Sequence, residues 1–284
     1  MEEKNSIILA IYGHLIGQIE SNKIPVTIRP KTTIGTVQDD PFDEWVREQI
    51  GVVFPQYDIV PTGPLMTPDI IIHDPATNLF LSIEVKKLVQ KANGSDPRGL
   101  TLDYNSCLPC GSALIKVDKE TLVIPCFYLF ALISPDSQQI VGSIFMDGDF
   151  LNYDFNLHKE AKYANVSEYG HGPYGEGSVR NRKMYTYPNP LNSKLSFLHL
   201  RHTLIVKKPD FETFPVAGKA TDIVVRDDIY GNSFHYLVID GLAEEKASPQ
   251  FAELPHRTDI FKACKQRLKK DRVASIPHLM SKKK

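Results

Sequence analysis

The chain has 284 residues, of which 42% are hydrophobic and 24% are charged, with four cysteines and a formal net charge of −1. These proportions are those of a globular protein and exclude a disordered chain or a disulfide scaffold. No apolar run reaches membrane-spanning length and the N-terminus carries no secretory cleavage pattern, so we expect a cytoplasmic protein. The balanced charge neither supports nor excludes nucleic-acid binding, because lysines can gather in one cleft.

Two helices are predicted before residue 60. Apolar residues recur at helical spacing over residues 5–20. A second helix is predicted to begin with Asp40 as N-cap and Pro41 at its first position. We expect its apolar side chains to face the core, namely Phe42, Trp45, Val46 and Ile50. Glu44 and Glu48 are four residues apart and share another face of this helix.

The stretch TPDIIIHDPATNLFLSIEVKKL, residues 67–88, predicts a β-hairpin. Apolar runs at 70–72 and 79–85 have strand character, and the polar turn 74–78 joins them. The same stretch contains Pro-Asp at the head of the first strand and Glu-Val-Lys at the end of the second.

Pairing of these two strands would bring Asp69 near Glu84. Side chains alternate along a strand, so Glu84 and Lys86 share one face while Val85 points into the core. Lys87 points the opposite way from Lys86. Two carboxylates form a hard-oxygen site suited to Mg²⁺, and a neighbouring lysine can orient a water or stabilise charge on a phosphorane. The alternative is a surface hairpin with a solvated Glu84–Lys86 pair.

Pro-Asp also occurs at Asp136 and Asp210. The Glu-x-Lys sequences that follow these two lie in polar, irregular stretches, at residues 160–162 and 244–246. Only the match at Asp69 has both halves on apolar runs at hairpin distance.

The pattern Pro-Asp…Glu-Val-Lys resembles the signature of the PD-(D/E)xK nuclease superfamily, most of all its type II restriction endonucleases. The resemblance implies that Asp69 and Glu84 bind Mg²⁺ with the Val85 carbonyl oxygen, and that Lys86 orients or activates the attacking water. It implies products with 5′-phosphate ends and the cytoplasm of a prokaryotic cell. Such enzymes often place a further acidic residue from a preceding helix near the metal. Here Glu44 or Glu48 could do so, a solvated helix face being the alternative.

The rest of the chain is expected to complete one α/β (mixed α+β) domain over residues 1–284, with a catalytic core at about 40–150. Residues 121–134 predict a central buried strand and residues 140–146 its neighbour. Further strands are expected at 195–206, 223–225 and 234–239, and a basic helix at 258–272. Asp147-Gly148-Asp149 is interpreted as a turn, with a metal-binding pair of carboxylates as the alternative. The resemblance implies a restriction-endonuclease-like core, a central mixed β-sheet flanked by helices, with loop excursions.

Two polar excursions, at about 90–118 and 163–190, are the candidate DNA-recognition segments. Arginine can bind guanine bidentately, lysine suits a phosphate, and amide and hydroxyl groups can contact base edges. The candidate DNA-binding residues are Lys91, Arg98, Asn105, Ser106, Arg180, Arg182 and Lys183. A connecting loop and a surface excursion with incidental charge are the respective alternatives.

The function expected from the resemblance is sequence-specific, Mg²⁺-dependent cleavage of double-stranded DNA by a homodimer. Three alternatives stay open. One is a structure-selective repair or junction nuclease, and another is a non-catalytic DNA-binding protein on the same fold. The third is a hydrolase of small phosphoesters.

Overall fold

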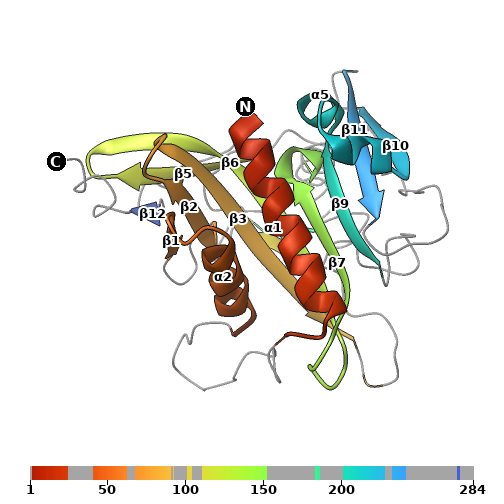
Figure 1. Ribbon diagram of the computed structural model, residues 1–284. Coiled ribbons are helices and arrows are strands. Elements are labelled where there is room, and N and C mark those ends of the chain that lie inside the picture. Colours follow the sequence, from red (N-terminus) through yellow and green to blue (C-terminus); the bar gives the residue numbers. More distant parts are fainter. Residues whose placement is uncertain are drawn as a thin grey trace, which may run out of the picture.

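The fold is a mixed β-sheet with helices packed against it (Figure 1). The computed structural model describes residues 2–24, 41–62, 68–90, 92, 101–103, 111–151, 183–185, 201–227, 232–240 and 274–275. In this part of the chain no helix is long and apolar enough to cross a membrane.

Two helices come first along the chain, and most of the elements that follow are strands. The helices are α1 (Glu2–Glu20), α2 (Pro41–Val53) and α5 (Lys208–Phe211), with the 3-10 helices η1 (Gly148–Leu151) and η2 (Pro215–Lys219). The first six strands are β1 (Asp58–Pro61), β2 (Ile70–Asp74), β3 (Leu79–Val89), β4 (Thr101–Asp103), β5 (Ser112–Val117) and β6 (Glu120–Ile133). The others are β7 (Ile140–Asp147), β8 (Lys183–Tyr185), β9 (His202–Lys207), β10 (Asp222–Asp227), β11 (Ser233–Asp240) and β12 (Ala274–Ser275).

Ten strands form one sheet, whose main path is β1-β2-β3-β6-β7-β9-β11-β10. Neighbours on this path are antiparallel except for β3–β6 and β7–β9, which are parallel. The strand β5 pairs with β6, and β12 pairs with β5. The predicted mixed sheet with packed helices is therefore confirmed, and it extends beyond the expected core of about 40–150, as far as Ser275.

Alternation of side chains divides the buried residues into two layers, one on each face of the sheet. On one face, Ile83 and Phe127 pack in the same cluster as Ile8 of α1 and Val46 of α2. Figure 1 shows α1 and α2 side by side over this face. On the other face, Phe130 of β6 belongs to a second cluster that also contains Phe150 of η1.

The helix α2 begins at Pro41, as predicted, and buries the four side chains expected to face the core: Phe42, Trp45, Val46 and Ile50. The rings of Phe42 and Trp45 stack with their centroids 5.8 Å apart. The predicted helix at 5–20 is α1, and the predicted hairpin and central strand are β2–β3 and β6. These elements are confirmed. They could be predicted because each has a continuous local apolar pattern.

The excursions differ from the expectation in part. Residues 112–117 of the 90–118 segment form β5, an integral strand of the sheet. The strands β4 and β8 pair antiparallel in a separate two-stranded sheet, so the two predicted excursions are joined to each other by backbone hydrogen bonds. Of the predicted strand at 195–206, residues 202–206 lie in β9. The predicted helix at 258–272 lies outside the described residues.

Replacement of Phe42 by alanine tests the packing of α2. The side chain is 1% exposed, so Phe42→Ala should lower the free energy of unfolding by about 3–5 kcal/mol, measured by urea denaturation. Val52→Ala is the control on the same helix, because Val52 is 65% exposed and its loss should change stability by no more than about 0.5 kcal/mol. Equal effects of the two substitutions would contradict this packing.

Candidate active site

The hairpin β2–β3 fixes the relative positions of the candidate catalytic residues. Its register runs from Ile70 opposite Ile83 to Asp74 opposite Leu79. In the turn, the Asp74 carboxylate accepts hydrogen bonds from the Ala76 N–H at 2.9 Å and the Thr77 hydroxyl at 2.7 Å. The polar turn predicted from the sequence is thus held by its own aspartate.

Asp69 lies one residue before β2, where the register places it opposite Glu84. Its Oδ2 accepts a hydrogen bond from the Val85 N–H at 2.7 Å, and its carbonyl accepts one from the Thr62 N–H at 3.0 Å. Both the side chain and the backbone of Asp69 are therefore fixed. The structure therefore places Asp69 near Glu84, as the hairpin predicted.

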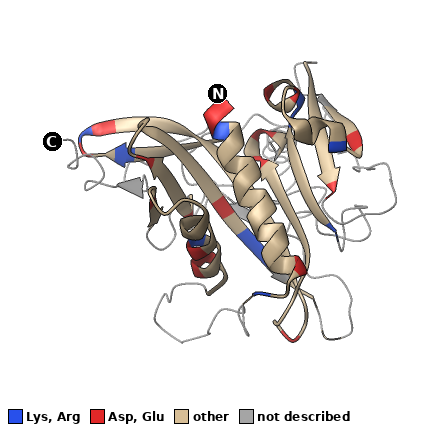
Figure 2. Ribbon diagram, viewed as in Figure 1, with Lys and Arg blue, Asp and Glu red and all other residues tan. Residues whose placement is uncertain are grey.

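The ammonium group of Lys86 lies among three oxygen atoms of this hairpin. It is 3.6 Å from Asp69 Oδ2, donates a hydrogen bond to the Val85 carbonyl at 3.1 Å and forms a hydrogen-bonded ion pair with Glu84 Oε1. Glu84 is 1% exposed, which excludes the solvated surface pair that was the alternative. Figure 2 shows the acidic and basic segments of β3 next to each other in the middle of the strand.

This environment keeps Lys86 protonated. Burial by itself lowers the pKa of Lys86, but the carboxylates of Asp69 and Glu84 outweigh burial and raise it above its ordinary value. Lys86 is consequently an ammonium ion at neutral pH in this state. It can act as a base only after another cation has taken over the two carboxylates.

Asp43 of α2 is a functional candidate that the sequence analysis missed. Burial and the carboxylates of Asp69 and Glu84 together raise the pKa of Asp43 to about 8, against the opposing effect of the Lys86 ammonium. A signal for it was present, since Asp43 lies two helical turns before the buried Ile50 and so borders the apolar stripe.

Glu44 and Glu48, the two predicted metal-site candidates from α2, are both exposed. Glu44 forms an ion pair with Arg47 at 3.7 Å, on the helix surface. The structure thus describes Asp43, rather than either glutamate, in electrostatic contact with the hairpin.

Lys87 lies on the opposite face of β3 from Lys86, as strand alternation predicted. Its ammonium is 5.7 Å from the centroid of the Phe42 ring, under α2. Burial lowers its pKa to about 7.

Of the predicted DNA-binding residues, Lys183 alone lies within the described segments, in β8, where the strand register sets its backbone opposite that of Asp103 of β4. The others lie outside the described residues: Lys91, Arg98, Asn105, Ser106, Arg180 and Arg182.

A second group of charges lies at the end of β7. The Asp147 carboxylate accepts a hydrogen bond from the Asp149 N–H at 2.9 Å, which is the turn that the sequence predicted. Lys207 pairs with Asp149 and is 3.9 Å from Asp147. Burial outweighs the opposing charge of Lys207, so the pKa of Asp147 is raised to about 6. This group closes the strand with internal ion pairs.

The oxygens that could hold a metal are those around the Lys86 ammonium. Among the described residues, no three His, Cys, Asp or Glu side chains converge as a metal site. The candidate set consists of two carboxylates and one backbone carbonyl: Asp69, Glu84 and Val85. Comparisons with protein-family models, curated proteins and solved structures gave no match, so the geometry of this site is what supports a function.

The charge on Asp43 should be visible in the pH dependence of stability. Its pKa is raised from 3.8 to about 8, so the folded protein holds a proton that the unfolded chain releases. Between about pH 4 and about pH 8, Asp43 is ionised in the unfolded chain and protonated in the folded protein, so the free energy of unfolding falls as pH rises through this range. Asp43→Asn should remove this part of the decline and be more stable than the wild type at pH 8, measured by urea denaturation across that range.

Glu44→Gln is the control, because Glu44 is an exposed neighbour on the same helix and its loss should leave the pH profile unchanged. Superimposable profiles for Asp43→Asn and the wild type would contradict the placement of Asp43 beside the hairpin carboxylates.

Proposed function

We propose that the protein is a sequence-specific, Mg²⁺-dependent endonuclease of double-stranded DNA, of the type II restriction class. The observation that carries the proposal is the Lys86 ammonium among Asp69 Oδ2, Glu84 Oε1 and the Val85 carbonyl oxygen. These are the residues that the nuclease resemblance assigns to metal binding and water activation.

The oxygen set fits Mg²⁺. Carboxylate and carbonyl oxygens are the ligands that this hard cation takes, and here they already surround a cation, the ammonium group. Asp69, Glu84 and the Val85 carbonyl would hold the metal. When bound, Mg²⁺ would supply Lewis-acid polarisation of the scissile phosphate and a more acidic water.

The chain's own residues have separate tasks in this proposal. Asp69 and Glu84 provide negative charge from fixed positions, because the Val85 N–H holds one and strand β3 holds the other. Once released from the carboxylates, Lys86 remains on the same face of β3, where it can orient the attacking water and stabilise charge on the phosphate. Asp43 holds a proton near neutral pH in this state, and its ionisation beside a bound cation would add negative charge from the helix side.

DNA is the proposed substrate for two reasons. The motif belongs to a nuclease pattern, and the excursion that leaves β3 is bound to the later glycine- and arginine-rich one through β4 and β8. Two polar segments joined in this way can contact a duplex together. Cleavage of both strands of a symmetric sequence requires two active sites, so we propose a homodimer in the cytoplasm of a prokaryotic cell.

Removal of the Lys86 charge should strengthen metal binding. In Lys86→Met the ammonium no longer competes for the three oxygens, so the dissociation constant for Mg²⁺ should fall by about tenfold or more, measured by isothermal titration calorimetry. Lys119→Met, in an exposed turn, is the matched control and should bind Mg²⁺ as the wild type does. Equal or weaker binding by Lys86→Met would show that metal and ammonium do not share these oxygens.

Cleavage itself is tested with phage DNA, incubated with the purified protein in Mg²⁺ or in EDTA. Discrete, metal-dependent fragments are expected, with 5′-phosphate ends. Glu84→Ala and Lys86→Ala should each lower the cleavage rate by about 100-fold or more while DNA binding is retained. Binding is measured by fluorescence anisotropy, and Lys119→Ala is the control for loss of a surface charge.

Two other outcomes of the cleavage assay would each indicate a different function. A smear in place of discrete fragments would indicate a structure-selective or non-specific nuclease. Intact DNA with every divalent metal tried, on unmodified DNA that the protein binds, would contradict catalysis and favour the DNA-binding protein.

A further inference from the structure

Asp69 lies just outside the strand ladder that holds the rest of its hairpin. The strand β2 begins one residue later, at Ile70, and the ladder between β2 and β3 begins there too. The Val85 N–H donates to the Asp69 carboxylate at 2.7 Å, but this bond keeps its geometry only while the backbone of Asp69 is itself held. A candidate metal ligand at the end of a strand therefore needs a further contact that sets its backbone.

Thr62, which directly follows β1, supplies that contact. Pro61 lies opposite Ile70, so the antiparallel register places Thr62 opposite Asp69. The Thr62 N–H donates a hydrogen bond to the Asp69 carbonyl oxygen at 3.0 Å. The Thr62 hydroxyl donates a second hydrogen bond, to the Pro68 carbonyl oxygen. One residue thus binds both of the peptide units that flank the Asp69 α-carbon.

The bond from the Thr62 hydroxyl has no substitute within the described part of the chain. Pro68 is buried and has no N–H, so its carbonyl oxygen is its one backbone hydrogen-bonding group. Among the described residues, only the Thr62 hydroxyl donates to it. A buried carbonyl that loses its donor is left unsatisfied, which is costly unless the peptide unit moves to another partner. Removal of the hydroxyl would therefore release the peptide between Pro68 and Asp69.

The orientation of this peptide decides where the Asp69 carboxylate lies. Because peptide units are planar, the two that flank the α-carbon of Asp69 set its two backbone dihedral angles, and these direct the side chain toward the Val85 N–H. The Asp69 side chain is 23% exposed, so burial alone does not confine it. Replacement of a residue that orients a metal ligand typically weakens metal binding by about 10- to 100-fold.

We propose that Thr62 is the positioning residue of Asp69, and that its hydroxyl keeps the Asp69 carboxylate beside Glu84 and the Val85 carbonyl oxygen, where it can bind Mg²⁺. Thr62 acts through Asp69 and is not itself a ligand. This inference rests on the proposed function, because it concerns a ligand of the same site. It adds the end of β1 to the elements that form the site.

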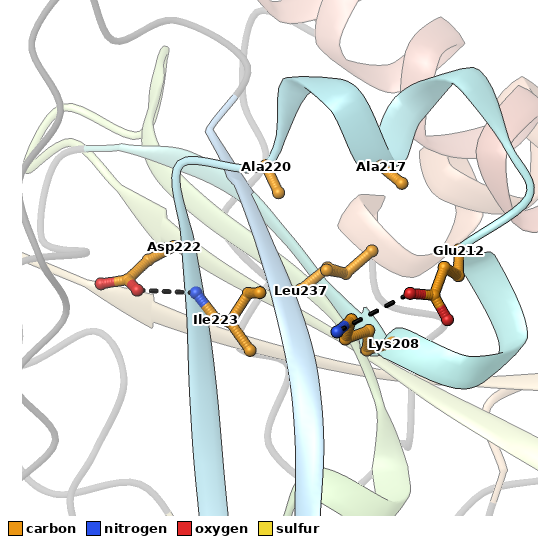
Figure 3. Close-up of a pocket in the computed structure, with 7 residues that line it drawn as sticks. All are labelled: Lys208, Glu212, Ala217, Ala220, Asp222, Ile223 and Leu237. Carbon is orange, nitrogen blue, oxygen red and sulfur yellow. Dashed lines mark hydrogen bonds and ion pairs between the residues drawn. The ribbon is translucent and has the colours of Figure 1, made fainter.

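A matched control residue, Thr221, lies directly before β10, which β6, β7, β9 and β11 separate from β3 in the sheet order. Thr221 donates both its N–H and its hydroxyl to the Val238 carbonyl oxygen, at 2.8 Å and 3.0 Å. Its chain neighbours Ala220 and Asp222 border a pocket of about 500 Å³ beside Leu237 (Figure 3). Thr221→Val therefore removes the same kind of hydrogen bond at a distance from the candidate site.

The first measurement is hydrogen exchange of the Val85 amide in the metal-free, full-length protein, followed by NMR. The Val85 N–H donates to Asp69 Oδ2, so its exchange rate reports whether the carboxylate stays in place. Thr62→Val keeps the N–H of residue 62 but removes the hydroxyl, and it should speed this exchange by about tenfold or more. Thr62→Ser keeps the hydroxyl and should exchange as the wild type does, and so should Thr221→Val.

The second measurement is Mg²⁺ binding by isothermal titration calorimetry. Thr62→Val should raise the dissociation constant by about tenfold or more, while Thr62→Ser and Thr221→Val should leave it unchanged. An unchanged Val85 exchange rate or an unchanged dissociation constant in Thr62→Val would overturn the proposal, as would equal effects of Thr62→Ser or Thr221→Val. A wild type that does not bind Mg²⁺ would contradict the proposed function instead, and the Val85 exchange rate would still decide whether Thr62 holds Asp69.

Discussion

The neutralisation of two carboxylates by one ammonium group is the interaction on which the site depends. Glu84 is almost fully buried, and Asp69 is held beside it by the Val85 N–H. A buried carboxylate without a countercharge costs several kcal/mol, so the hairpin needs a cation among these oxygens. Lys86 supplies it in the structure, and in the proposed function Mg²⁺ takes its place during catalysis. The arrangement that stabilises the fold is thus the arrangement that would select a metal.

The rest of the fold keeps this interaction in place. Strand β3 lies between β2 and β6, with Glu84 opposite Tyr128 and Lys86 opposite Phe130 of the parallel neighbour. Strands bonded on both sides cannot slip by one residue without moving every side chain to the other face. On the helix face, Val85 packs in the same cluster as Phe42 and Ile50 of α2, which brings Asp43 toward the hairpin. Rigid elements therefore position all four ionisable groups: Asp43, Asp69, Glu84 and Lys86.

Local pattern explains what the sequence could predict. The hairpin, α2 and the strand β6 each have a continuous apolar pattern bounded by turn or capping residues. Alternation along β3 also correctly placed Lys86 and Lys87 on opposite faces. The contribution of Asp43 depends on how α2 packs against β2 and β3, which no local pattern encodes. The strand β5 was missed for a similar reason, because its pairing with β6 defines it more than its own composition does.

The most direct test of the central claim is the anomalous scattering of Mn²⁺ in crystals of the protein soaked with that ion. The account predicts a peak bounded by Asp69, Glu84 and the Val85 carbonyl oxygen, with the Lys86 ammonium displaced from them. Lys86 still bound to both carboxylates at saturating Mn²⁺, with no peak between them, would contradict it.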